Sequence, residues 1–172
     1  TLPLYANNSM GIHQSQVGYL LTAYSFAALI IRPFAGYAYD CIGRRKTYIV
    51  SLSVFTLVTF SYPLAGTFFL LVFFRFMHGL SFGMTSTGAG TIVGDILPAG
   101  RRGEGVGYFG LANTISMALG PAVGLSVIEG YSFHTLFIVT GIVILIAFLL
   151  SNLIHFPHYT AQKKSLALST FF

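Results

Sequence analysis

Five long apolar runs dominate the sequence, and each of them is long enough to cross a lipid bilayer as a helix. A helix needs about 20 residues for that crossing. The runs are residues 17–39, 47–64, 67–97, 105–128 and 135–154. Charged residues make up only 8% of the chain, against about 25% in soluble domains, so they are too few to cover a water-exposed surface. We therefore predict an all-α integral membrane protein.

Both ends of the chain differ from these runs. Residues 1–6, TLPLYA, look like the last turns of a further helix, and the chain does not begin with Met. Residues 156–172 are more polar and contain no further run. We predict that residues 1–155 form a six-helix transmembrane bundle whose first helix is truncated. Residues 156–172 are then expected to begin a cytoplasmic loop.

The basic residues indicate how this bundle is oriented. Short loops make neighbouring helices antiparallel, so alternate loops lie on the same side of the membrane. One side carries Arg44, Arg45, Lys46, Arg101, Arg102, Lys163 and Lys164, and the loops of the other side carry no Lys or Arg. Because basic loops stay in the cytoplasm, we place this side, with the lone Cys41, on the cytoplasmic face of the cell membrane. Charges that cluster between apolar runs also argue against nucleic-acid binding.

The densest group of charges is the stretch GYAYDCIGRRK between the first two runs. Gly36 and Asp40 are four residues apart, so they lie on one face of a helix. A glycine at position 36 would let another helix approach closely. Gly43 permits a turn, across which Asp40 can pair with Arg44 or Arg45. The spacing thus predicts an ion pair at a helix end.

This stretch resembles the G-x-x-x-D-R-x-G-R-R/K signature that the major facilitator superfamily carries between its second and third helices. The matching residues are Gly36, Asp40, Gly43, Arg44, Arg45 and Lys46. Cys41 departs from the signature, which usually has Arg there. The resemblance covers nearly the whole chain and implies the N-terminal half of a twelve-helix transporter. It also implies that Asp95 joins these charges in a cytoplasmic latch between the halves, although Lys46 alone fits a topology anchor equally well.

Arg75 is the next notable residue, because a charge at membrane depth costs from about 2.5 to more than 10 kcal/mol. Arg75, Gly79 and Gly83 recur every four residues in RFMHGLSFG and share a helix face. They resemble the R-x-x-x-G-x-x-x-G signature of helix 4 in the same family. The resemblance implies a role in proton coupling or in binding an anionic group. The alternative is a side chain that extends to the outer interface.

Three other polar side chains within the runs are candidates for a substrate or coupling site. His78 is in mid-span, three residues from Arg75, and is either a proton relay or a neutral histidine bonded to a carbonyl. Arg32 precedes Pro33 and either reaches the cytoplasmic edge or has a functional role. Asn113 belongs to a stripe of small and polar residues and is expected to line the wall of the site.

The stretch ALGPAVGL contains a G-P-x-x-G pattern formed by Gly120, Pro121 and Gly124. Proline removes a backbone hydrogen bond and bends a helix. A longer form, G-x-x-x-G-P-x-x-G, occurs in helix 5 of many antiporters of the family, but Ser116 replaces its first glycine here. The pattern therefore suggests an antiporter or, alternatively, a glycine-rich seam between packed helices.

Together these features predict a secondary transporter that exports a small organic molecule in exchange for protons by alternating access. Its expected partners are the substrate, protons, the lipid bilayer and a second half. The sequence has no metal-ligand spacing, nucleophile set or phosphate loop, so we expect neither an enzyme nor a cofactor. Two alternatives remain open: a proton symporter that imports a sugar or organic acid, and a membrane interaction module without transport.

Overall fold

The computed structural model describes residues 14–154 and 156. The predicted helix remnant at 1–6 and the loop residues 157–172 lie outside them. Within the described residues, five helical spans are long and apolar enough to cross a membrane, which confirms the predicted all-α fold class. The helices and 3₁₀ turns are α2 (Gln14–Ile30), α3 (Arg32–Cys41), α4 (Arg44–Ser61), η1 (Tyr62–Leu64), α5 (Phe68–Ile96), η2 (Ala99–Arg101), α6 (Arg102–Gly130) and α7 (Phe133–Ser151).

The first span is interrupted, in contrast to the single run predicted at 17–39. Helices α2 and α3 lie on either side of Ile31, next to Pro33. Proline has no N–H to donate, and it disfavours helical geometry for the residue before it. Ala35 still donates a backbone hydrogen bond to the Ile31 carbonyl at 2.8 Å. The two helices therefore remain connected parts of one membrane span.

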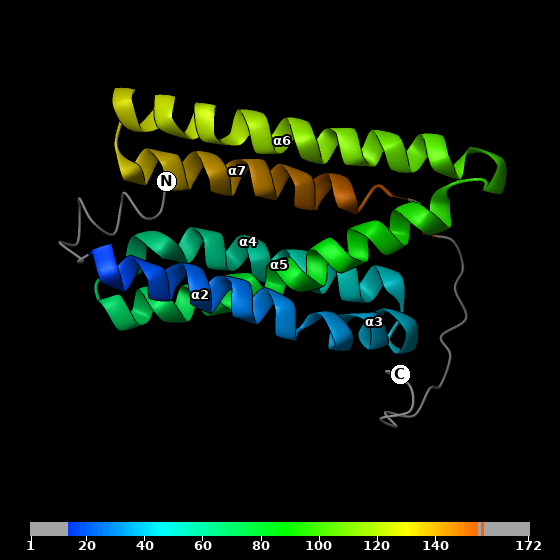
Figure 1. Cartoon of the computed structure of the whole chain (residues 1–172), viewed down its shortest axis with the longest axis horizontal. Coiled ribbons are helices and arrows are strands. Elements are labelled where there is room, and N and C mark those ends of the chain that lie inside the picture. Colours follow the sequence, from blue (N-terminus) through cyan, green and yellow to red (C-terminus); the bar gives the residue numbers. More distant parts are fainter. Residues whose placement is uncertain (1–13, 155, 157–172) are drawn as a thin grey trace.

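Local sequence signals determine where several helices begin. Thr67 precedes α5, and its side-chain oxygen accepts a hydrogen bond from the backbone N–H of Leu70. Ser132 caps α7 in the same way, with Thr135 as the donor. Gly43 precedes α4 with a φ of 109°, in the region that favours glycine. These tight connections reverse the chain, so that α4, α5, α6 and α7 run in alternating directions (Figure 1).

Helix α5 lies at the centre of the first group of helices, and its glycines allow close neighbours. Figure 1 shows α5 running obliquely past α2 and α4 towards the start of α6. A Cβ at Gly79 would collide with the carbonyl oxygen of Tyr24, and one at Gly83 would collide with the backbone of α2. Gly88 leaves room for the ring of Tyr39 on α3. Small residues let membrane helices pack backbone to backbone, so these positions fix α2 and α3 on α5.

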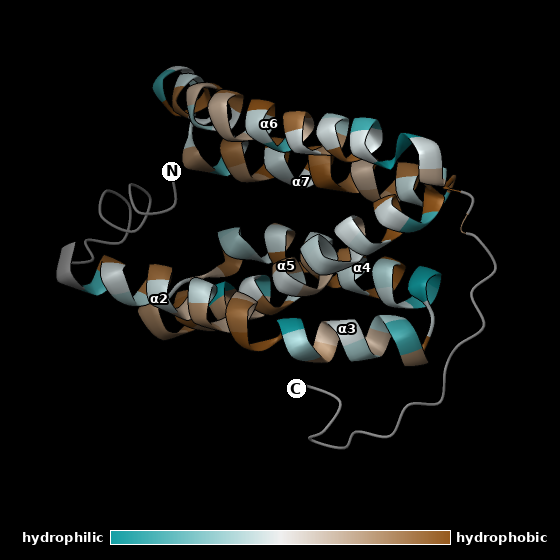
Figure 2. Ribbon diagram, turned by 45° about the vertical axis from the view of Figure 1, so that its right-hand side comes forward, coloured by the Kyte–Doolittle hydropathy of each residue, from teal (hydrophilic) through white to brown (hydrophobic). Residues whose placement is uncertain are grey.

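Helices α6 and α7 form a second layer beside this group (Figures 1 and 2). In α7, Gly141 packs against the ring of Phe60 of α4. Helix α6 buries only Gly124 among its residues. Figure 2 shows hydrophobic residues along both layers and hydrophilic residues on α3 and near the ends of α6. Helices that contact lipid or further helices have an apolar outer surface of this kind.

One cluster of buried hydrophobic residues lies around η1, where α4 ends and α5 is about to begin. It consists of Leu20, Tyr62, Ala65, Leu71 and Phe137. These side chains come from α2, η1, α5 and α7 and from the loop after η1. The core thus joins both layers and holds Tyr62 in a fixed place near Arg75.

Candidate functional site

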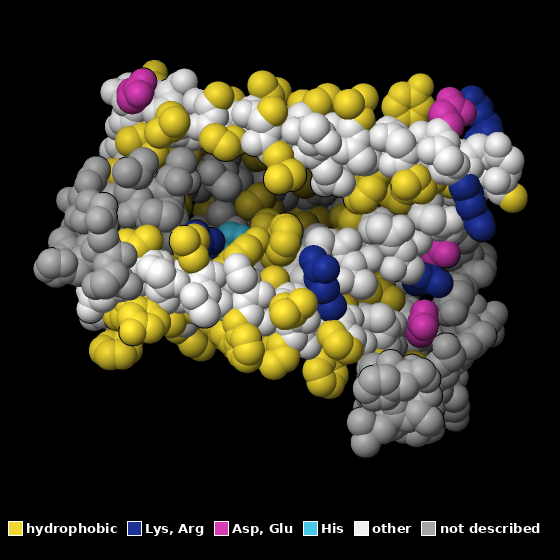
Figure 3. All heavy atoms as spheres, viewed as in Figure 1, with side chains coloured by type: hydrophobic (Ala, Val, Ile, Leu, Met, Phe, Trp, Pro, Cys, Tyr) yellow, Lys and Arg dark blue, Asp and Glu magenta, His cyan; other side chains and the backbone are white. Residues whose placement is uncertain are grey.

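Three charged side chains from three helices meet at one end of the bundle, and we call Asp40, Arg44 and Asp95 the charge cluster. They lie at the end of α3, the start of α4 and the end of α5, respectively. Arg44 Nε is 2.7 Å from Asp95 Oδ2, and Arg44 Nη2 is 4.0 Å from Asp40 Oδ1. Figure 3 shows charged side chains gathered towards this end. The shorter contact joins α4 to α5.

The charge cluster is partly open to its surroundings. The exposed fractions are 13% for the Arg44 side chain, 34% for Asp40 and 29% for Asp95. Beside it, the Tyr39 hydroxyl donates a hydrogen bond to the carbonyl of Met84 at 3.1 Å. The two carboxylates are more exposed than the guanidinium, so the contact joins α4 to α5 where water can reach its acidic side.

The other residues of the signature make different contacts. The guanidinium of Arg45 lies over the ring of Phe156 at 6.0 Å from its centroid, and Lys46 is exposed. Arg44, rather than Arg45, is therefore the arginine that lies near Asp40. A Cβ at Gly36 would meet nothing within 4 Å. The close helix approach expected at this glycine is thus not seen among the described helices.

Arg75 lies against aromatic rings, and we call Arg75, His78, Tyr24 and Tyr62 the Arg75 site. The guanidinium carbon is 5.1 Å from the ring centroid of Tyr24 and 5.8 Å from that of Tyr62. Its Nε is enclosed and has no hydrogen-bond partner among the described residues. A cation over an aromatic face gains about 0.5–2 kcal/mol. Two such contacts offset part of the cost of a charge at membrane depth.

His78 bonds a tyrosine hydroxyl instead of the backbone carbonyl considered from the sequence. Its Nδ1 is 2.9 Å from the hydroxyl oxygen of Tyr62. Its ring meets Phe55 edge-on, with centroids 4.5 Å apart and an interplanar angle of 90°. Tyr24 also meets the imidazole edge-on at 5.7 Å. The site therefore contains a cation and an imidazole that share two tyrosines.

Tyr24 and Tyr62 were not predicted from the sequence. The chain has 10 tyrosines, and neither of these two belongs to a recognisable spacing. Tyr62 is only 2% exposed, and its ring stacks on Phe137 of α7 at 5.5 Å with an interplanar angle of 13°. The sequence signal for such residues is Arg75 itself. An arginine within an apolar run requires compensating groups on neighbouring helices.

The two remaining substrate-site candidates lie apart from the Arg75 site. Arg32 is exposed at the start of α3. Asn113 is exposed on α6, and its amide donates a hydrogen bond to the Phe109 carbonyl of the same helix at 3.1 Å. Within the described helices, the structure therefore brings together Arg75 and His78 but not Arg32 or Asn113.

The G-P-x-x-G pattern lies inside α6, which continues through Pro121 without a break. Gly124 is buried, but a Cβ at Gly120 would meet nothing within 4 Å. Both glycines and Ser116 line a mostly apolar groove of about 430 Å³ between α6 and α7. The pattern therefore forms one wall of a groove, and only its second glycine is packed closely in the described part of the chain.

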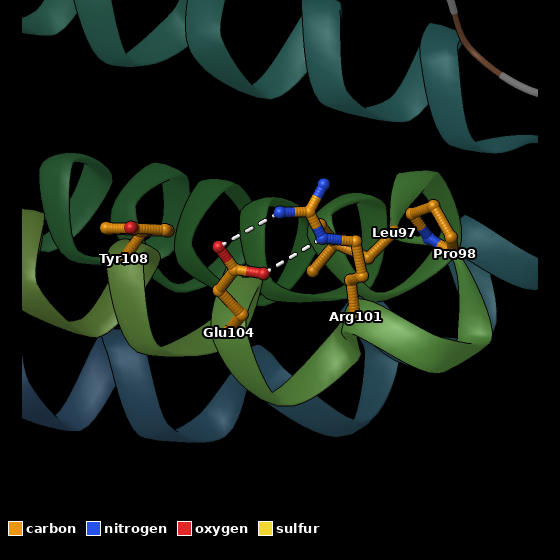
Figure 4. Close-up of a pocket in the computed structure, with 6 residues that line it drawn as sticks. Leu97, Pro98, Arg101, Glu104 and Tyr108 are labelled. Carbon is orange, nitrogen blue, oxygen red and sulfur yellow. Dashed lines mark hydrogen bonds and ion pairs between the residues drawn. The ribbon is translucent and has the colours of Figure 1, made fainter.

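A second, smaller pocket of about 280 Å³ lies at the corner between α5 and α6. Figure 4 shows Arg101 and Glu104 facing one another beside it, with Tyr108 farther along α6. Arg101 Nε is 2.9 Å from Glu104 Oε2, and both side chains are largely exposed. Arg101 thus forms a surface ion pair within one turn, unlike Arg44, which joins two helices.

Comparisons with known proteins agree with this architecture. Residues 1–169 match the family model of the Major Facilitator Superfamily. The chain is 29% identical to the quinolone resistance protein NorA of Staphylococcus aureus over 157 residues, which are 91% of this chain and 40% of NorA. It is 30% identical to multidrug resistance protein 2 of Bacillus subtilis over 138 residues, which are 80% of this chain and 34% of that protein. The chain thus spans about two fifths or less of these relatives, and the match over nearly all its residues shows that it belongs to the Major Facilitator Superfamily.

Proposed function

We propose that the chain forms one half of a secondary transporter that exports small organic compounds in exchange for protons. Two six-helix halves would alternate between outward-open and inward-open states around a site near the middle of the membrane. The family, and the resistance proteins that the chain is similar to, support this function. NorA is named for resistance to quinolones, so quinolones are the first compounds to test as substrates.

The observation that carries the proposal is the bridge from Arg44 to Asp95. A transporter of this kind must hold its cytoplasmic ends together in one state and release them in the other. The 2.7 Å contact joins the start of α4 to the end of α5. Asp40, 4.0 Å from Arg44, adds a second carboxylate. The two carboxylates are 34% and 29% exposed, so water can solvate them when the contact separates. This suits a reversible latch.

The orientation follows from the same end of the bundle. Arg45 and Lys46 lie directly after Arg44, and Arg101 and Arg102 lie in the connection between α5 and α6. By the positive-inside rule these connections face the cytoplasm. The charge cluster would then close the cytoplasmic entrance, and the Arg75 site would lie deeper in the membrane.

Exchanging the charges of the bridge tests the latch directly. In the full-length protein, we expect Arg44→Asp or Asp95→Arg alone to reduce efflux of a quinolone about tenfold or more, because each leaves like charges together. The double exchange, Arg44→Asp with Asp95→Arg, is expected to restore much of the efflux. Asp40→Asn should have a smaller effect than Asp95→Asn, since Asp40 lies farther from Arg44.

The exposed pair Arg101–Glu104 supplies the matched control at the same end of the bundle. Reversing that pair, with Arg101→Glu and Glu104→Arg, should leave efflux near the wild-type level at equal amounts of protein in the membrane. If the double variant of Arg44 and Asp95 transports no better than the single variants, the latch is contradicted. Unchanged efflux in all the single variants would show that the ion pair has no role in transport.

A further inference from the structure

We propose that Tyr62 is a positioning residue of the transporter: its ring supports the guanidinium of Arg75, and its hydroxyl orients the imidazole of His78. This inference rests on the proposed transport function. It gives a role to a side chain that lies outside every sequence pattern of the chain. Two contacts carry it, the 5.8 Å approach to Arg75 and the 2.9 Å bond to His78.

The first step concerns what balances the charge of Arg75. The four acidic residues of the chain have other positions: two belong to the charge cluster, one pairs with Arg101, and Glu129 lies in the last turn of α6. No acid among the described residues forms an ion pair with Arg75. The rings of Tyr24 and Tyr62 are therefore the groups that face its guanidinium.

The second step concerns how firmly Tyr62 is held. The side chain is 2% exposed. Its ring stacks on Phe137 of α7 at 5.5 Å and meets Phe74 of α5 edge-on at 6.3 Å. Leu20 and Leu71 complete the surrounding core. Because the ring is fixed by three other helices, the direction of its hydroxyl is fixed as well.

The third step concerns His78. Ring contacts with Phe55 and Tyr24 surround the imidazole. Among the described residues, the Tyr62 hydroxyl is the polar group bonded to its Nδ1. A tyrosine hydroxyl can donate to Nδ1 or accept from it, so the bond orients the imidazole in either tautomer. Arg75 and His78 are three residues apart on α5 and share a face, so Tyr62 holds both from one side. Loss of its hydroxyl should slow turnover rather than weaken substrate binding.

A double-mutant cycle in the full-length protein tests this role. Initial transport rates are measured in proteoliposomes at equal protein content for Tyr62→Phe, His78→Phe and the double variant. We expect each single variant to lower the maximal rate about five- to tenfold, as expected for one lost hydrogen bond, with KM nearly unchanged. The double variant should be no slower than His78→Phe alone. Tyr131→Phe, which removes the hydroxyl of an exposed tyrosine, should behave as the wild type.

A spectroscopic readout separates this contact from the transport function. In ¹⁵N-histidine spectra of the same protein in lipid nanodiscs, the His78 signal is identified by its loss in His78→Phe. We expect Tyr62→Phe to shift that signal. An unshifted signal, or rate losses that multiply in the double variant, would overturn the proposal. The signal could also shift in a protein that transports no quinolone or other organic compound. The contact between Tyr62 and His78 would then stand, but its role in transport and the proposed function would both be overturned.

Discussion

At the scale of single residues, the two arginines Arg44 and Arg75 are balanced in different ways. Arg44 faces two carboxylates at the end of the bundle, whereas Arg75 faces two tyrosine rings. A carboxylate accepts either a lysine or an arginine as a partner. A stack between aromatic faces depends on the flat, delocalised guanidinium, which a lysine ammonium does not reproduce.

This difference predicts the effect of Arg75→Lys. We expect the variant to reach the membrane at the wild-type level, because the positive charge and the long side chain are retained. Proton-driven transport should fall about tenfold or more, because the ammonium loses its place between Tyr24 and Tyr62. The measurement is the initial rate of efflux at matched expression.

Arg101→Lys is the control, since the Arg101 side chain is 73% exposed and pairs with the carboxylate of Glu104. It should transport normally. Near-normal transport by Arg75→Lys would show that the side chain has only a structural role.

The sequence supported some of these residue contacts and not others. The approach of Arg44 to Asp40 follows from helix spacing and from the turn at Gly43, which are local properties. The aromatic contacts of Arg75 join residues that are 51 and 13 positions apart in sequence, Tyr24 and Tyr62. Such contacts depend on how helices cross, and no local spacing encodes this. For the same reason the sequence did not show that Asn113 is exposed on α6 and bonded to the Phe109 carbonyl of its own helix.

At the scale of the elements, the packing of α2 and α3 on α5 depends on glycine. The apolar runs predicted the spans, because about 20 apolar residues are needed in any membrane helix. They did not predict the break at Ile31, since a run of apolar residues continues through it. Pro33 was the local signal for that break, and a proline within a membrane span is compatible with either a continuous or an interrupted helix.

A substitution at Gly79 tests this packing. A Cβ there would collide with the backbone oxygen of Tyr24, which cannot move aside as a flexible side chain does. We therefore expect Gly79→Ala to destabilise the protein by about 1–3 kcal/mol, and to lower the temperature at which it aggregates in detergent. The measurement is the monomer peak in size-exclusion chromatography after heating.

Gly90→Ala is the matched control on the same helix, because a Cβ there would meet nothing within 4 Å. It should be neutral or slightly stabilising, as alanine favours a helix. Equal thermal stability of the two variants would show that α2 does not approach α5 as closely as described.

At the scale of the whole molecule, two surfaces of the bundle have opposite characters. Most of the charged side chains in view gather towards one end (Figure 3), while α6 leaves nearly all of its side chains exposed. Charge at the end fits an interface with water, and the uncovered helix fits contact with lipid or with another half of a transporter. The proposed orientation places the charge cluster on the cytoplasmic side of the membrane.

Labelling of Cys41 tests that orientation. Cys41 is the only cysteine of the chain, and it is partly exposed next to the charge cluster. In a full-length protein without other cysteines, a membrane-impermeant maleimide should label Cys41 in inside-out vesicles and not in intact cells. Labelling in intact cells would reverse the proposed topology.

A cysteine in the turn between α6 and α7 provides the opposite control. Tyr131 is 72% exposed in that turn. In a Cys41→Ser background, Tyr131→Cys should be labelled in intact cells. In the proposed topology, the C-terminal ends of α3 and α6 lie on opposite faces of the membrane. Labelling of both positions from the same side would contradict it.

The central claim, exchange of a compound for protons, is tested most directly by transport into proteoliposomes with an imposed pH gradient. The purified full-length protein is reconstituted, and uptake of the compound that it exports from cells is measured with an acidic lumen, an alkaline lumen and no gradient. We expect an acidic lumen to increase uptake several-fold, because protons leave as the compound enters. Uptake driven instead by an alkaline lumen would identify a symporter, and uptake that is independent of the gradient would contradict proton coupling.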